Sequence, residues 1–133
     1  MKAYLLRYRF SVCCIVLIFI LCFCKPSALP VDLPTMVGFD KLCHLVMYLG
    51  TCGVIWTEYI RSHQSIAWMR CLLLATLAPA LMSVGIEWAQ AALTDYRGYD
   101  LYDIYANLTG VLLSLLIPYG WVLAQKNKCN TEL

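Results

Sequence analysis

The sequence has little charge. Asp, Glu, Lys and Arg make up 14% of the 133 residues while 62% are hydrophobic, and the mean hydropathy is +0.70. Because soluble domains of ordinary composition carry about 25% charged residues, we expect an integral membrane protein whose partner is the lipid bilayer. The net charge of +2 comes from scattered basic residues, so the composition argues against nucleic acid as a partner.

Paired metal-binding motifs are also missing. The sequence contains no CxxC pair and no HExxH motif, although it has eight cysteines. Most of these cysteines lie inside apolar runs, where they are better interpreted as small packing residues than as zinc ligands or disulfides. We therefore expect no metal centre and no cofactor.

Four apolar runs are present, and a helix needs about 20 residues to cross a bilayer. The first run, residues 10–24, is slightly short for this, and the other three are long enough. The four runs predict an all-α, four-helix membrane bundle that forms one domain over 1–133, with helices at about 8–24, 41–60, 70–93 and 100–125. Asp40 is the expected N-cap of the second helix, and Pro79 is expected to kink the third. The first run lacks a small-residue cleavage pattern after it, which favours a retained helix over a signal peptide.

Basic residues predict the orientation of the bundle. Seven of the ten Lys and Arg residues fall on the side of the two termini and the second loop, and three fall on the other side. Short loops rich in Lys and Arg stay in the cytoplasm, so we expect both termini there, in the inner (cytoplasmic) membrane. The charges at Glu58, Arg61, Arg70 and the carboxyl-terminal lysines are expected to be solvated or snorkelling helix ends.

Polar side chains interrupt three of the predicted helices near the same membrane face. Asp100, Asp103 and Asn107 recur at i, i+3 and i+7, which places them on one helix face. With the predicted topology, the polar residues converge at the outer leaflet and form an outward-facing pocket. We expect Arg97 to pair with Asp100 or Asp103 there, and Lys41 with Glu87. The expected pocket residues are Asp40, Lys41, His44, Tyr48, Glu87, Gln90, Arg97, Asp100, Asp103 and Asn107.

The spacing of these residues carries a family resemblance. The pattern runs Asp40-Lys41-x-x-His44-x-x-x-Tyr48, then Glu87-x-x-Gln90, then Arg97-x-x-Asp100-x-x-Asp103-x-x-x-Asn107-x-x-Gly110. Over about residues 36–120 the chain resembles the VanZ-like family of small membrane proteins. The resemblance implies a multi-pass protein of the bacterial cell envelope, in a family whose named member is associated with resistance to the antibiotic teicoplanin. It implies no particular biochemical activity.

Three interpretations of the polar cluster follow from the residue types. In the first, the pocket binds an envelope precursor, a lipid headgroup or a glycopeptide-related ligand. In the second, the protein is an enzyme acting on an envelope lipid or precursor; a general base and a divalent metal would serve it, and His44, Glu87 and Asp103 are the catalytic candidates. In the third, the charges only fix helix packing and no ligand binds.

Overall fold

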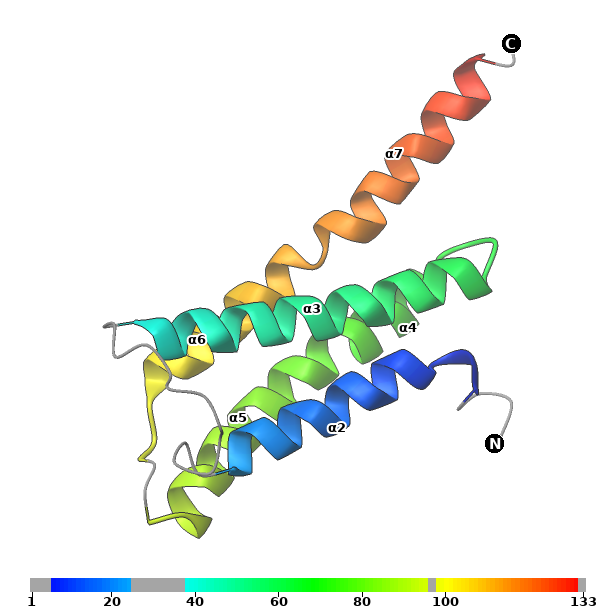
Figure 1. Ribbon diagram of the computed structural model, residues 1–133. Coiled ribbons are helices and arrows are strands. Elements are labelled where there is room, and N and C mark those ends of the chain that lie inside the picture. Colours follow the sequence, from blue (N-terminus) through cyan, green and yellow to red (C-terminus); the bar gives the residue numbers. More distant parts are fainter. Residues whose placement is uncertain (1–5, 25–37, 96–97, 132–133) are drawn as a thin grey trace.

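The computed structural model describes residues 6–24, 38–95 and 98–131, and this part of the chain contains helices joined by short connections and no strand (Figure 1). The predicted all-α class is therefore confirmed. The elements in chain order are α2 (Arg9–Phe23), α3 (Phe39–Ser62), α4 (Trp68–Leu72), the π-helical turn η2 (Leu73–Leu77), α5 (Ala78–Leu93), α6 (Leu101–Leu113) and α7 (Leu116–Thr131).

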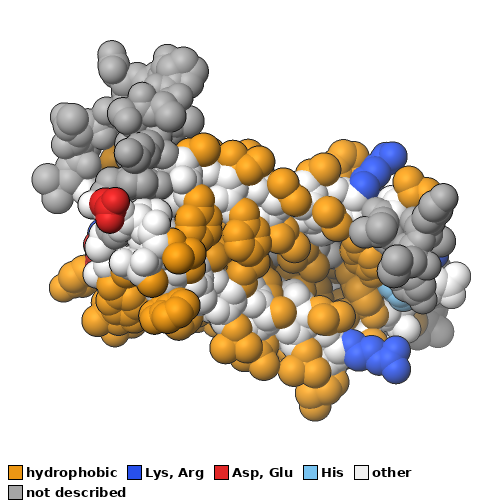
Figure 2. Space-filling view, turned by 90° about the horizontal axis from the view of Figure 1, so that it is seen from below, with side chains coloured by type: hydrophobic (Ala, Val, Ile, Leu, Met, Phe, Trp, Pro, Cys, Tyr) orange, Lys and Arg blue, Asp and Glu red, His pale blue; other side chains and the backbone are white. Residues whose placement is uncertain are grey.

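Two stretches of helix are long and apolar enough to cross a membrane. They are Trp68–Leu93, which comprises α4, η2 and α5, and Leu101–Asn130, which comprises α6 and most of α7. Helix α2 is also apolar but has only 15 residues. Figure 2 shows hydrophobic side chains across the middle of one face and charged side chains near its two ends. This arrangement supports association with a membrane.

With Asp40 as N-cap, helix α3 would begin at Lys41. It begins two residues earlier, at Phe39. Gly38 is the N-cap, with φ of 88°, and Asp40 lies within the first turn. A positive φ is a conformation that glycine adopts without the steric cost that a Cβ imposes, so the glycine and not the aspartate defines the entry into the helix. Asp40 still complements the positive end of the helix dipole.

Helices α3 and α6 pack against each other more extensively than any other pair of described helices. Gly110 of α6 faces the backbone of α3, where a Cβ would overlap the carbonyl oxygen of Leu45 and lie 2.9 Å from the amide nitrogen of Leu49. This glycine therefore lets the two backbones approach closely, as small residues do in membrane helix pairs. Beside this contact lies a core of buried side chains, which are Ile18, Cys22, Tyr48, Cys52, Ile86 and Val111.

The helix disturbance expected at Pro79 takes the form of the π-helical turn. This turn, Leu73–Leu77, ends two residues before the proline. Proline has no N–H to donate, and its ring presses on the carbonyl of the residue four positions earlier, which is Ala75. A single wide turn accommodates both effects without ending the helix.

The predicted fourth helix is interrupted near its middle. Between α6 and α7, the carbonyl of Ser114 accepts a hydrogen bond from the amide of Ile117 at 3.2 Å. The partner for a regular helix would be residue 118, but Pro118 has no N–H. From this tighter turn α7 leaves the bundle (Figure 1) and continues to Thr131, past the expected end at about Gln125.

Glu58 is not a solvated helix end. It is buried, with 9% of its surface exposed, and it accepts hydrogen bonds from the amides of Phe10 and Ser11 at 3.1 and 3.0 Å and from the Ser11 hydroxyl at 2.5 Å. These amides belong to the first turn of α2, where no intrahelical acceptor exists. Glu58 therefore caps α2 from the neighbouring helix, a role that its position in the sequence did not indicate.

Candidate functional site

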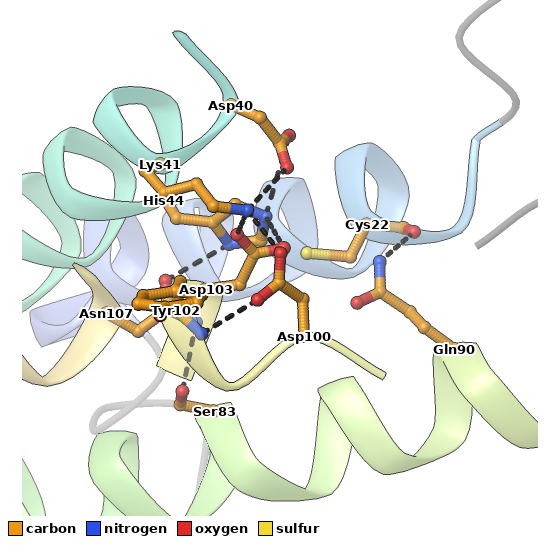
Figure 3. Close-up of polar contacts among 10 residues, drawn as sticks. All are labelled: Cys22, Asp40, Lys41, His44, Ser83, Gln90, Asp100, Tyr102, Asp103 and Asn107. Carbon is orange, nitrogen blue, oxygen red and sulfur yellow. Dashed lines mark hydrogen bonds and ion pairs between the residues drawn. The ribbon is translucent and has the colours of Figure 1, made fainter. Parts of the chain in front are cut away.

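Four helix ends lie together at one end of the bundle. They are the carboxyl ends of α2 and α5 and the amino ends of α3 and α6 (Figure 1). Most of the predicted polar residues lie near these ends, and Figure 3 shows those of α3 and α6 joined to one another, with Ser83 of α5 joined to Asn107. Six of the predicted residues contact one another there, and we call this set the polar cluster: Asp40, Lys41, His44, Asp100, Asp103 and Asn107.

Lys41 joins the start of α3 to the start of α6. Its ammonium group donates hydrogen bonds to Asp100 and, at 2.7 Å, to Oδ1 of Asp103. We expected Lys41 opposite Glu87, and that expectation was wrong, because the two aspartates lie on the α6 turns that pack directly against α3. The hydrogen bond from Lys41 holds the pKa of Asp100 below its usual range.

Asp100 also caps a helix. It is the N-cap of α6, where its side chain accepts a hydrogen bond from the backbone amide of Tyr102 at 2.8 Å. An aspartate cap satisfies one amide of the first turn and also complements the helix dipole. The local sequence that begins α6 therefore also fixes a carboxylate against Lys41.

His44 is oriented by a chain of hydrogen bonds that crosses three helices. The side-chain amide of Asn107 donates to Oγ of Ser83 at 2.9 Å, so its oxygen is left to face Nδ1 of His44 at 3.1 Å. An amide oxygen only accepts, which places a proton on Nδ1. In a neutral imidazole the other nitrogen, Nε2, then carries the lone pair.

Nε2 of His44 faces two carboxylates. It lies 3.5 Å from Oδ2 of Asp103 and 3.9 Å from Oδ1 of Asp40. His44 and Asp103 are almost fully buried, with side-chain exposures of 4% and 2%, while Asp40 is 55% exposed. The cluster therefore has a buried floor and one carboxylate at its mouth.

The remaining predicted residues lie elsewhere in the bundle or outside the described residues. Gln90 donates from Nε2 to the carbonyl of Cys22 at 2.6 Å, so it caps the end of α2. Tyr48 is part of the apolar core, and Glu87 is completely buried in α5. Arg97, and with it the expected pairing of Arg97 with Asp100 or Asp103, lies outside the part of the chain that the structure describes.

Ser83 is a member of the network that sequence reasoning missed. It is fully buried in α5 and accepts the hydrogen bond that orients Asn107. Ser83, Glu87 and Gln90 stand at i, i+4 and i+7, so they share one helix face. That spacing would have identified the serine, because it extends the polar face that Glu87 and Gln90 already marked.

The side chains of the polar cluster contact one another, so the cluster differs from the open pocket that we expected. A groove of about 550 Å³ lies along α2 and α3, but its lining is mostly apolar and contains none of the predicted pocket residues. Within the cluster, each described charge has an opposite charge within 4 Å. A ligand would therefore meet the cluster at its exposed edge, beside Asp40 and Asp100.

Comparison with known proteins gives one distant similarity. Over 78 residues the chain is 32% identical to an uncharacterized protein of the yeast Schizosaccharomyces pombe, and the match covers 59% of this chain and 45% of the yeast protein. The chain thus spans less than half the length of this relative. No protein-family model and no solved structure matches the chain. Since the relative is fungal, the bacterial origin implied by the VanZ-like resemblance stays a proposal.

Proposed function

We propose that this chain is a VanZ-like multi-pass membrane protein that binds the polar headgroup of an envelope lipid or lipid-linked precursor at its polar cluster. It has four transmembrane helices and both termini in the cytoplasm, so that the cluster lies in the outer leaflet. The exposed apolar surface of the bundle and the position of the cluster at one end of it support this proposal. The motif from Asp40 to Gly110 supports the family.

The burial of Asp103 beside His44 and Lys41 carries the proposal. Charged groups within a membrane bundle cost several kcal/mol unless they are neutralised, and a purely structural bundle packs more cheaply with apolar or small side chains. Here a 2% exposed carboxylate, a buried imidazole and an ammonium group come from two helices to one point. Such a concentration of polar groups is typical of a binding site.

Charge determines which ligand group fits the cluster. Lys41 is not available to hold an anionic group, because its ammonium already donates to two carboxylates. Three carboxylates (Asp40, Asp100 and Asp103) face this single ammonium. A headgroup that enters here therefore meets carboxylates and not an available ammonium group.

Lipid retention by the purified protein tests this function. The protein is extracted from a bacterial membrane in mild detergent, and native mass spectrometry then identifies the lipids that stay bound. His44→Ala and Asp103→Asn are expected to lose at least about 90% of the retained polar lipid while remaining inserted, because both replace a buried group of the cluster. Arg61→Ala, an exposed position at the other end of α3, is the matched control. Equal retention by all four proteins contradicts the proposal.

A cellular measurement tests the antibiotic connection that the resemblance implies. A susceptible bacterium that expresses the chain is expected to tolerate more teicoplanin than one that expresses His44→Ala at the same abundance in the membrane. If both strains have the same susceptibility as an empty-vector strain, the chain does not act on glycopeptide sensitivity, whatever lipid it binds.

Catalysis is the second candidate, and the orientation of His44 favours it. Asn107 fixes the imidazole with its lone pair on Nε2, the form in which a histidine acts as a general base. If the protein transforms its lipid, then membranes that contain the wild-type chain accumulate a lipid species that His44→Ala membranes lack. If the two membranes have identical lipid profiles and the wild-type chain still retains lipid, the protein binds its lipid without transforming it.

A further inference from the structure

We infer that Asp40, His44 and Asp103 bind one divalent transition-metal ion, of the Mn²⁺ or Zn²⁺ type. The role that we give the ion rests on the proposed function, but the binding of the ion does not. These donors come from the start of α3 and the start of α6 and form no short metal-binding motif in the sequence. They are brought together only when these helices pack.

The spacing of the donor atoms suits a single ion. Nε2 of His44 lies 3.5 Å from Oδ2 of Asp103 and 3.9 Å from Oδ1 of Asp40. Two ligands that each lie about 2.1 Å from one ion are about 3.4 Å apart at a tetrahedral angle. The three donor atoms lie within 4.8 Å of one another, somewhat wider than one ion needs. Asp40 is the exposed member, so its side chain has the most room to move and close the gap.

Lys41 aims both carboxylates at the imidazole. Its ammonium donates a hydrogen bond to Oδ1 of Asp103 at 2.7 Å and lies 3.9 Å from Oδ2 of Asp40, so it attracts one oxygen of each aspartate. The other oxygen of each aspartate is the one that faces Nε2 of His44 (Figure 3). Supporting contacts of this kind orient metal ligands and are often needed for tight binding.

The orientation of His44 suits a metal ligand. Asn107 accepts from Nδ1, so Nε2 is the atom that faces the two carboxylate oxygens. Metal-binding histidines are held in the same way, with the second ring nitrogen hydrogen-bonded to a neighbouring group. Imidazole with two carboxylates is a ligand set that suits Zn²⁺ and Mn²⁺.

The ion also explains how an acidic cluster could hold an anionic headgroup. Three protein ligands leave at least one coordination position open, as in catalytic zinc sites. A phosphate oxygen of a lipid or lipid-linked precursor would take that position at the exposed edge beside Asp40. The ligand class is therefore a phosphate-bearing headgroup, joined to the protein through the metal.

Manganese binding to the purified full-length chain tests the inference. After removal of metal with EDTA, Mn²⁺ is titrated into the protein in detergent and free Mn²⁺ is followed by electron paramagnetic resonance. We choose Mn²⁺ because the chain has exposed cysteines that would bind zinc independently. The expected result is one bound ion per chain, with the affinity reduced at least about 100-fold in His44→Gln and Asp103→Asn.

Two control variants show whether any change in Mn²⁺ binding is specific to the proposed ligands, because they remove a histidine and a carboxylate elsewhere in the chain. His63→Gln removes the other histidine, which is exposed and stacks on Tyr59, and Asp95→Asn removes an exposed carboxylate. Both are expected to bind Mn²⁺ like the wild type. Asp40→Asn changes only the exposed ligand, so it keeps the test valid if the buried variants fail to fold, and it is expected to weaken binding about 10-fold or more.

Either of two results overturns the inference. One is a folded wild-type chain that binds no stoichiometric Mn²⁺, and also no Zn²⁺ after its thiols are blocked. The other is binding that Asp40→Asn and His44→Gln leave unchanged. Since no lipid takes part in this titration, a metal-binding chain that retains no lipid would refute the proposed function alone.

Discussion

Gly110 in α6 lies directly against the backbone carbonyl of Leu45 in α3. The same faces of these two helices carry the polar cluster, with His44 one residue before Leu45 and Asn107 three residues before Gly110. The glycine contact therefore sets how closely the donors of the two helices approach. Packing and the candidate site depend on the same pair of helices.

Gly110→Ala is expected to lower the free energy of unfolding by about 1–3 kcal/mol, because overpacked contacts cost this much and here the added Cβ meets backbone that cannot rotate away. Thermal unfolding in detergent measures the loss. Gly50→Ala is the matched control, since a Cβ at Gly50 meets nothing within 4 Å and alanine favours the helix. A Gly110→Ala protein as stable as Gly50→Ala would refute the close approach of α3 and α6.

Glu58→Gln is expected to lower the free energy of unfolding by about 2 kcal/mol, as the loss of hydrogen bonds to a buried charged group does. A glutamine oxygen still accepts from the amide of Phe10, but its NH₂ group then faces the Ser11 amide, which is also a donor. Hydrogen exchange of the first turn of α2 should rise in this variant. Arg61→Gln, an exposed change one turn further along α3, should leave that exchange unchanged.

Asp100→Asn is expected to reduce stability at neutral pH and to have no effect in strong acid. The folded-state pKa of Asp100 lies below the usual value of about 3.9, so its contribution is complete above that value and disappears as the pH falls through the folded-state pKa. Both partners are about one-third exposed, which limits the effect to roughly 1 kcal/mol. Unfolding curves of the two proteins between pH 7 and pH 2 should therefore converge. A gap that persists at pH 2 would show that Asp100 acts by some other means.

The sequence predicts the helices well because hydrophobic runs determine them locally. The start of α3, the capping aspartate of α6 and the disturbance near Pro79 all have local signals, although at α3 the glycine outweighed the aspartate. The i, i+3, i+7 spacing also predicts that Asp100, Asp103 and Asn107 share a face. That spacing requires only helical periodicity, and no knowledge of the neighbouring helices.

Pairing between helices could not be predicted in the same way. Lys41 was expected opposite Glu87 because both lie near the same end, but the choice between Glu87 and the α6 aspartates depends on which helix packs against α3. Gly110 determines that packing, and its role becomes visible only when the backbones are in place. Glu58 was misjudged for the same reason, since its partners in α2 are 47 and 48 positions away in the sequence.

Reporter fusions test the proposed orientation, on which the outer-leaflet position of the cluster depends. Green fluorescent protein fused after Leu133 in a bacterial host should fluoresce, because that end is expected in the cytoplasm. Alkaline phosphatase fused after Thr94, at the end of α5 beside the polar cluster, should be active, because that enzyme needs the oxidising periplasm for its disulfides. Fusion of the phosphatase after His63, in the basic loop that follows α3, is the control and should be inactive. If the activities after Thr94 and His63 are reversed, the cluster faces the cytoplasm, and its ligand must then be a headgroup or precursor of the inner leaflet.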